Sequence, residues 1–367
     1  MGKHLAKQIE HVIHTPNAKI NDTGLKKILW CASQVYGSAA FSRRKLYQQK
    51  KCFLKKLPVP VISIGNLAVG GTGKTPMTIH LAKLLRKKHY FPAILSRGYG
   101  GTFEKKGGIV SNGNSILADA TQAGDEPLMM AKQLAGIPLI VGHCRYRSGL
   151  EAINKLGCNL IILDDGFQHL SLFRNLNIVL MDAFKPIGNG YLLPRGILRE
   201  PLGALVDADA VIFTRSPTKK PPIAAEILPF LRGLPLFWAK QAAYIDGAIA
   251  KSKKINAPTL NDLNGKRVYL FSGIARNEDF HQTITATKAR IAGHDKFGDH
   301  HRYTKNEIDT IIKMAIKTKA DWLLTTKKDF ARIVTSVQWP LPFAVIGVKM
   351  TFFNDAFDQF VLKAIGA

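Results

Sequence analysis

Residues 59–76 read VPVISIGNLAVGGTGKTP, and this stretch determines the class of fold. Residues 59–64 are a run rich in β-branched side chains, typical of a buried strand. A glycine-rich loop follows, and apolar residues then recur at helical spacing over residues 79–85. Strand, glycine-rich loop, Gly-Lys-Thr and helix make up the P-loop in the context that this motif requires. The sequence therefore predicts a P-loop NTPase, an α/β fold with a doubly wound, mostly parallel sheet.

The residue types of the loop explain its expected chemistry. Backbone N–H groups of glycines close around phosphate oxygens, Lys74 reaches the β- and γ-phosphates, and the hydroxyl of Thr75 faces a magnesium ion. The first glycine of the usual motif is replaced by Ala68, which is small enough to be tolerated. A glycine-rich turn without a nucleotide is the alternative. The predicted nucleotide-binding residues are Ala68, Val69, Gly70, Gly71, Thr72, Gly73, Lys74 and Thr75.

A second apolar run, residues 159–163, ends in two carboxylates, Asp164 and Asp165, as a magnesium-holding strand of a P-loop enzyme does. We expect Asp164 to hold the metal with Thr75. Asp165 either joins the site or caps the following turn. Polar residues continue with Gln168 and His169, at the strand edge where open α/β folds bind ligands.

Three further polar stretches have the composition of functional loops. Residues 96–101 read SRGYGG, and their glycines permit close approach to a ligand. Residues 124–127 read GDEP, which places two acids in the first turn of a helix; Asp125 is either catalytic or the N-cap. Residues 193–201 read LPRGILREP, which sets Arg195 and Arg199 in a turn-rich loop suited to stabilising a transferred phosphate.

The chain is strongly basic, with 367 residues and a formal net charge of +26. A composition that is 46% hydrophobic and 21% charged excludes a disordered basic tail or a collagen-like fibre. Such a charge suits nucleic acid, an anionic membrane or phosphorylated substrates, and proteome bias is the fourth explanation. The four cysteines form no C-x-x-C pair, so no zinc or disulfide framework is expected.

The first 56 residues carry a formal charge of +10. They include an uncharged run over residues 28–41, which is shorter than the roughly 20 residues of a membrane-spanning helix. Apolar residues recur at helical spacing, so an amphipathic helix is predicted over about 25–41. With Trp30 and Tyr36, it suits the interface of an anionic leaflet. Packing of the apolar stripe on the protein's own core is the alternative.

Taken together, the motifs resemble one family. GNLAVGGTGKTP, SRGYGG, GDEP, LDDGFQH, LPRGILREP and FGDH occur in the order of the tetraacyldisaccharide 4′-kinases, the lipid A 4′-kinases of Gram-negative bacteria. The resemblance covers nearly the whole chain. It implies transfer of the ATP γ-phosphate to the 4′-hydroxyl of a tetraacylated glucosamine disaccharide 1-phosphate, giving lipid IVA. It also implies a peripheral enzyme at the cytoplasmic face of the inner membrane.

The resemblance also assigns roles to residues. It implies a catalytic pair, Asp125 as base and His300 as its partner, with Lys74 on the phosphates; the neighbouring His301 leaves the histidine open. Glu126 is implied in the metal or phosphate shell. The remaining expected active-site residues are Asp165, Gln168, His169, Arg145, Arg195, Arg199 and Glu200. Two positions depart from the family's pattern, Cys144 before Arg145 and Lys327, where a charge reversal leaves the role of the Lys327-Lys328-Asp329 loop open.

The expected organisation has four parts. A basic segment spans residues 1–56, a P-loop kinase domain 57–235 and a smaller α/β domain 236–353, and a C-terminal helix over 354–367 returns to the kinase domain. The runs 236–245 and 343–353 are expected to pair as a hinge, so that His300 approaches Asp125 only on closure. Thr304 and Glu307 form a predicted capping box that starts a helix.

Two rival functions remain open from the residues. A P-loop switch or chaperone NTPase has the same Gly-Lys-Thr and Asp-Asp-Gly elements, although no Asn-Lys-x-Asp guanine-reading motif occurs. A nucleic-acid-stimulated ATPase would use the positive charge, but the charge gathers beside an aromatic-bearing helix and no base-stacking repeat is present. The favoured partners are therefore a lipid disaccharide and an anionic membrane surface, with no nucleic acid.

Overall fold

The computed structural model describes residues 9, 12–13, 24–49, 54–218, 221–250, 253–254, 258–333 and 337–366. The chain divides into two units. The first holds the described residues up to Gln241 and from Met350 onward, and the second holds those from Ala242 to Lys349. The divisions fall inside two long strands, β8 (Leu236–Ala250) and β13 (Phe343–Phe352), which neighbour each other in sheet order.

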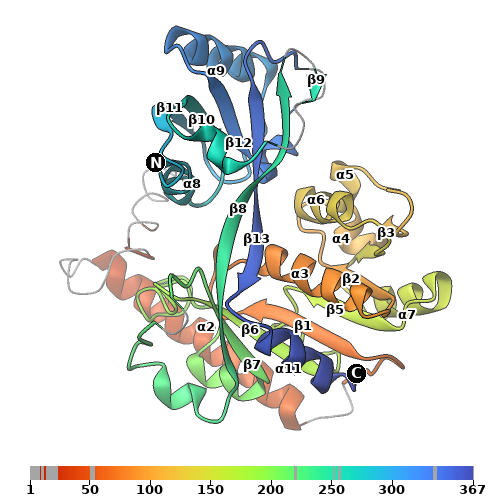
Figure 1. The fold of residues 1–367 in the computed structure, drawn as a ribbon. Helices are drawn as coiled ribbons and strands as arrows, with labels where there is room; N and C mark the ends of the chain where they lie inside the picture. Colours follow the sequence, from red (N-terminus) through yellow and green to blue (C-terminus); the bar gives the residue numbers. More distant parts are fainter. Residues whose placement is uncertain are drawn as a thin grey trace. The chain divides into compact units, whose positions relative to one another are not determined.

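The first unit is built around a parallel sheet with helices on its faces (Figure 1). Its strands lie in the order β8-β7-β6-β1-β5-β2-β4-β3, and β3 alone among these pairs antiparallel, to β4. The other elements are α2 (Gly24–Gln49), β1 (Val61–Asn66), α3 (Lys74–Lys87), β2 (Pro92–Ser96), α4 (Phe103–Lys106), β3 (Gly108–Ser111), α5 (Ala120–Ala123), α6 (Asp125–Gln133), β4 (Leu139–Val141), α7 (Arg145–Leu156), β5 (Leu160–Asp164), β6 (Leu176–Asp182), β7 (Ala210–Thr214) and α11 (Ala356–Ala364), with 3₁₀ turns at Leu202–Asp207 and Leu228–Leu231. The predicted P-loop α/β fold is confirmed.

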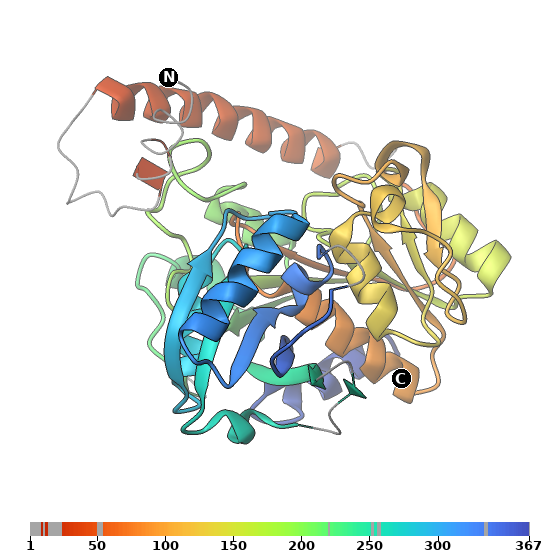
Figure 2. The same cartoon turned by 90° about the horizontal axis from the view of Figure 1, so that it is seen from above.

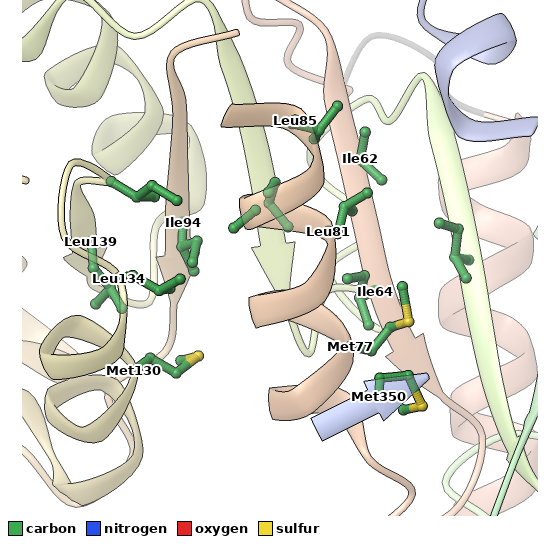
Figure 3. Close-up of a cluster of buried hydrophobic side chains, with 14 of the residues drawn as sticks. Ile62, Ile64, Met77, Leu81, Leu85, Ile94, Met130, Leu134, Leu139 and Met350 are labelled. Atoms are coloured by element: carbon green, nitrogen blue, oxygen red, sulfur yellow. The ribbon is translucent and has the colours of Figure 1, made fainter. Parts of the chain in front are cut away.

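The central strands are buried on both faces, which explains their continuous apolar sequence. Ile62 and Ile64 of β1 pack against Met77 and Leu81 of α3 in one core cluster (Figure 3). Met350 of β13 joins the same cluster. Because β1 and β5 pair in parallel, with Ile64 beside Asp164, the P-loop and the two carboxylates leave the sheet at the same edge.

The second unit has a smaller sheet in the order β11-β10-β12-β13-β8. In it, β10 pairs in parallel with β11 and β12, β12 pairs in parallel with β13, and the short β9 is antiparallel to β8. Its elements are β9 (Lys253–Lys254), a 3₁₀ turn at Leu260–Leu263, β10 (Arg267–Ser272), α8 (Asn277–Thr285), β11 (Arg290–Lys296), α9 (Lys305–Lys317), β12 (Trp322–Thr326) and α10 (Lys327–Phe330). The predicted capping box is present, because Thr304 and Glu307 satisfy each other's backbone N–H groups at the start of α9.

The N-terminal helix α2 is longer than predicted and docks on the protein mainly by a polar face. It runs from Gly24 to Gln49, where the sequence predicted about 25–41, and Figure 2 shows it as one continuous helix. Its buried residues are Lys26, Leu29, Ser33 and Arg44, so most of the contact face is polar. Of the predicted apolar stripe, Leu29 is buried, whereas Ile28 and Val35 are 67% and 72% exposed, so only part of that stripe packs on the protein. Of the basic residues counted in segment 1–56, five lie outside the described residues: Lys3, Lys7, Lys19, Lys50 and Lys51.

No helix among the described residues is both long and apolar enough to cross a membrane. Cys31, Cys144 and Cys158 are free thiols, and Cys52 lies outside the described residues.

Candidate active site

The P-loop connects β1 to α3 and has the backbone that phosphate binding requires. Gly70 and Gly73 have φ values of 117° and 87°, which disfavour any residue with a Cβ. A Cβ at Gly73 would also lie 2.4 Å from Nε2 of Gln241. Two hydrogen bonds to Thr72 hold the loop in place. The side-chain amide of Asn66 donates to Oγ1 of Thr72 at 2.8 Å, and the Thr214 hydroxyl donates to the Thr72 carbonyl at 2.9 Å. The loop amides are therefore held in place before any ligand arrives.

Lys74, Asp165 and Arg199 form an ion-pair cluster beside the loop. Lys74 Nζ lies 3.6 Å from Oδ1 of Asp165, and Arg199 Nη1 donates to Oδ2 and Oδ1 of the same carboxylate at 2.9 and 3.2 Å. Burial raises the pKa of Asp165, but the two cations outweigh burial and hold it below its usual value. The side chain of Asp165 thus organises the two cations predicted to contact phosphate.

Asp164 ends β5 and is 6% exposed. It accepts hydrogen bonds from the Thr78 and Ser96 hydroxyls, each at 3.1 Å. Burial, followed by the charges of Asp165 and Glu126, raises the pKa of Asp164 to about 6. The carboxylates of Asp165 and Glu126 therefore act by charge repulsion on Asp164, next to the P-loop. A bound cation stabilises such an arrangement.

Asp125 and Glu126 stand in the first turn of α6. The N-cap position is Gly124, so Asp125 is the first helical residue and the expectation that it caps the helix is wrong. Both side chains are half-buried. Acids in this position interact favourably with the helix dipole and remain available for chemistry.

The donor set at this edge fits magnesium. Carboxylate oxygens of Asp164 and Glu126 and the hydroxyl of Thr75 are hard ligands, the kind that Mg²⁺ prefers. Within the described residues, no group of three or more His, Cys, Asp or Glu side chains is placed to hold a metal alone. Mg²⁺ in phosphoryl-transfer sites binds through few carboxylates together with substrate phosphates, so the two observations agree.

The predicted residues after β5 border the same edge. The Gln168 side chain donates to the Asn66 carbonyl at 2.9 Å, just before the P-loop. Burial, and then the charge of Arg145, lowers the pKa of His169 to about 4, so the ring is neutral at physiological pH. Arg145 is buried and donates to the Gly142 carbonyl at 2.7 Å.

Arg195 was predicted to stabilise a phosphate and Glu200 to lie in the active site, but in the structure both contact α2. Arg195 donates to the Lys26 carbonyl at 3.1 Å and stacks on Tyr191 at 4.0 Å from the ring centre. Glu200 is 7% exposed and accepts from Nε of Arg44 at 2.7 Å. Their loop nevertheless touches the P-loop, because the Val69 N–H donates to the Ile197 carbonyl at 2.7 Å.

His300 lies in the second unit, in the loop before α9. Its side chain is 53% exposed, and its φ of 62° is left-handed. The neighbouring His301 stacks on Phe297 and lies 3.2 Å from Glu307, so it is engaged in the packing of its own unit. This difference favours His300 as the histidine available for chemistry, and its pairing with Asp125 stays a prediction.

Sequence reasoning missed Asn66, Thr78 and Ser96, which support the P-loop and Asp164. Two of them carried a readable signal. Ser96 ends β2 and opens the SRGYGG stretch, at the strand edge that already held the two aspartates. Thr78 lies one turn after Lys74 in α3, and therefore on the same face of the helix.

Comparison with known proteins identifies the family of this chain. The model of the family described as tetraacyldisaccharide-1-P 4′-kinase matches residues 25–366. Tetraacyldisaccharide 4′-kinase from Desulfatibacillum aliphaticivorans is 40% identical over 335 residues, 90% of this chain and 89% of the relative. The enzyme from Desulfotalea psychrophila is 40% identical over 340 residues, 92% and 96% of the two chains. A crystal structure of LpxK from Aquifex aeolicus in complex with ATP matches with a TM-score of 0.73 at 30% identity, covering 93% of this chain and 99% of that one. The chain belongs to the tetraacyldisaccharide-1-P 4′-kinase family.

Proposed function

We propose that this protein transfers the γ-phosphate of ATP to the 4′-hydroxyl of a tetraacylated glucosamine disaccharide 1-phosphate, in lipid A biosynthesis. The observation that carries the proposal is the cluster at the carboxyl ends of β1 and β5, where the P-loop, Lys74, Asp164 and Asp165 meet in a member of this kinase family. The Aquifex aeolicus relative, crystallised with ATP, supports ATP as the phosphate donor.

Each residue has a defined task in this proposal. The P-loop amides and Lys74 bind the phosphates, and Arg199, oriented by Asp165, stabilises charge on the transferred group. Thr75, Asp164 and Glu126 hold Mg²⁺, which neutralises phosphate charge when bound. Asp125 accepts the proton of the attacking hydroxyl.

The Asp125→Asn variant tests the assignment of the base. It removes proton acceptance and keeps the shape of the side chain, so label transfer from ATP to detergent-dispersed lipid should fall by about 10²–10⁴-fold. The affinity for ATP should stay nearly unchanged, because the P-loop is intact. Asp309→Asn, at an exposed position on α9, is the matched control. Normal turnover by Asp125→Asn would remove Asp125 as the base.

We further propose that α2 lies in the interface of an anionic membrane, at the cytoplasmic face of the bacterial inner membrane. Ile28, Val35 and Leu46 are 67%, 72% and 48% exposed, and their spacings of 7 and 11 residues place them on one face of the helix. The opposite side docks through Arg44 and Leu29. An exposed apolar stripe on a basic helix is the composition of interfacial anchors.

Vesicle binding tests this placement. The double variant Ile28→Asp/Val35→Asp should bind vesicles containing an anionic phospholipid much more weakly than the parent protein, with ATP affinity retained. Ile316→Asp, at a 51% exposed position on α9, is the matched control and should leave binding unchanged. Equal binding by the double variant and the parent would refute the interfacial role of α2.

A further inference from the structure

A buried charged pair in the second unit lies behind His300. Asp329 in α10 is fully buried, and the side chain of Arg332, three residues later, is 1% exposed. Both follow β12; Asp329 belongs to the Lys327-Lys328-Asp329 loop, whose role the sequence left open, and Arg332 comes after it. Charged side chains are almost never buried to this extent unless they are held by partners.

Asp329 is held by a set of neutral and charged donors. Its Oδ1 accepts from the Gly273 N–H at 2.9 Å, its Oδ2 accepts from the Thr326 hydroxyl at 2.6 Å, and Nη1 of Arg332 lies 3.8 Å from Oδ1. Burial raises the pKa of Asp329, while these partners act in the opposite direction. The same Nη1 of Arg332 donates to the Gly273 carbonyl at 3.2 Å. The guanidinium is therefore fixed by backbone as well as by charge.

The other end of the guanidinium contacts the histidine. Nη2 of Arg332 lies 3.1 Å from Nδ1 of His300. A guanidinium has donors and no acceptor, so Nδ1 must supply a lone pair, and the proton of the neutral ring stands on Nε2. Asp299 also faces the ring: its Oδ2 is 3.8 Å from Nε2, and its Oδ1 accepts from the His300 N–H at 3.0 Å.

We propose that Arg332, itself held by Asp329, is a positioning residue that keeps the His300 ring in one orientation with its proton on Nε2. The catalytic consequence rests on the proposed function and on the predicted pairing of His300 with the base Asp125. In this tautomer His300 presents an N–H donor to a carboxylate or hydroxyl oxygen and does not serve as the proton acceptor. That division of labour leaves proton acceptance to Asp125.

The tautomer can be measured without any assay of activity. The full chain is labelled with ¹⁵N-histidine, and long-range ¹H–¹⁵N spectra are recorded at pH 8.5; His300 is assigned by the signals lost in His300→Gln. The proposal expects an unprotonated Nδ1 and a protonated Nε2 in the parent protein. Arg332→Met should give tautomer-averaged nitrogens, and Arg332→Lys, which keeps a donor, should restore the parent pattern in part. A protonated Nδ1 in the parent protein, or an unchanged Arg332→Met spectrum, would overturn it.

A double-mutant cycle separates positioning from folding. Arg332→Met should lower kcat by about 10–100-fold, as loss of an orienting partner does at other sites, with the KM for ATP unchanged. In the His300→Gln background it should lower kcat no further, while its loss of thermal stability should be the same in both backgrounds. An equal kcat loss in both backgrounds would show that Arg332 acts through folding alone. Normal turnover by His300→Gln would instead remove His300 from the proposed mechanism. The NMR measurement of the His300 tautomer would then still test whether Arg332 positions the ring. If Arg332→Met does not fold, Arg332→Lys takes its place in the cycle.

Discussion

The Asp164→Asn substitution removes a carboxylate that folding buries beside two other acids. The ordinary pKa of 3.8 rises to about 6 in the folded protein, through burial first and then through Asp165 and Glu126. A shift of about two pKa units corresponds to roughly 3 kcal/mol of folding free energy. Asparagine keeps the shape of the side chain and can still bond the Thr78 and Ser96 hydroxyls, so the substitution isolates the charge.

The size of the effect depends on pH. In the unfolded chain Asp164 ionises near pH 3.8, whereas in the folded protein it keeps its proton until about pH 6. The folded state therefore binds more protons in that window, and stability falls as the pH rises through it. Above about pH 6 the parent protein carries the full cost, and below pH 3.8 it carries none. Asp164→Asn should be more stable than the parent by up to about 3 kcal/mol at pH 8, with a smaller gain at pH 5.

Urea unfolding at both pH values, without magnesium, measures this gain, and Asp309→Asn is the surface control. Kinase turnover by Asp164→Asn should fall at least about 100-fold, because the site loses a carboxylate ligand for the Mg²⁺ that would neutralise phosphate charge. A variant that is less stable than the parent at pH 8, or whose gain is the same at pH 5 and pH 8, would refute the reasoning about the buried charge.

Two further predictions concern the surroundings of the site. Arg44→Ala leaves Glu200 and Asp207 without their buried cation, so it should lower the free energy of unfolding by about 3 kcal/mol and expose α2 to protease. Lys45→Ala, on the exposed side of the helix, should do neither. Equal protease sensitivity of the two variants would contradict this docking. His169 has its pKa lowered to about 4, so the folded state binds fewer protons than the unfolded chain between pH 6.5 and about 4, and stability falls as the pH drops through that window. His169→Gln should therefore lose less stability than the parent between pH 7 and pH 5, and an equal loss in urea unfolding would count against a buried neutral ring.

The central part of the first unit could be predicted because its signals are local. A β-branched run, a glycine-rich loop and an apolar helical repeat each fall within about ten residues, and β1, the P-loop and α3 follow them closely. The same holds for β5 with its terminal Asp164, and for the capping box at Thr304 that starts α9. In each case the residue types that specify the local structure also carry the chemistry.

The docking of α2 could not be predicted, because its decisive partners are distant in sequence. Arg44 looks like one member of a basic surface cluster until Glu200 and Asp207 bury it. The helix also approaches closely at Gly37, where a Cβ would lie 2.6 Å from Leu192. Hydrophobic periodicity assumes that the apolar face of a helix is its buried face. In α2, ion pairs and a close contact bury a mainly polar face instead.

The placement of Arg195 and Glu200 has the same cause. The motif that contains them resembles a phosphate-binding loop in composition, and Arg199 does contact Asp165. Arg195 and Glu200 instead contact α2, because the chain turns repeatedly within this loop and its side chains do not share one face. The composition of residues 193–201 predicted a functional loop. Which of its side chains face the active site and which face α2 is decided by the fold.

The central claim is that this chain is a lipid kinase, and product formation tests it most directly. The purified protein is incubated with ATP, Mg²⁺ and the detergent-dispersed tetraacyl disaccharide 1-phosphate, and in parallel with DNA or RNA in place of the lipid. The account predicts that each ATP consumed yields one disaccharide lipid with a second phosphate, on the 4′ position, and that nucleic acid causes no ATP consumption. ATP hydrolysis stimulated by nucleic acid, with no phosphate on the lipid, would contradict it.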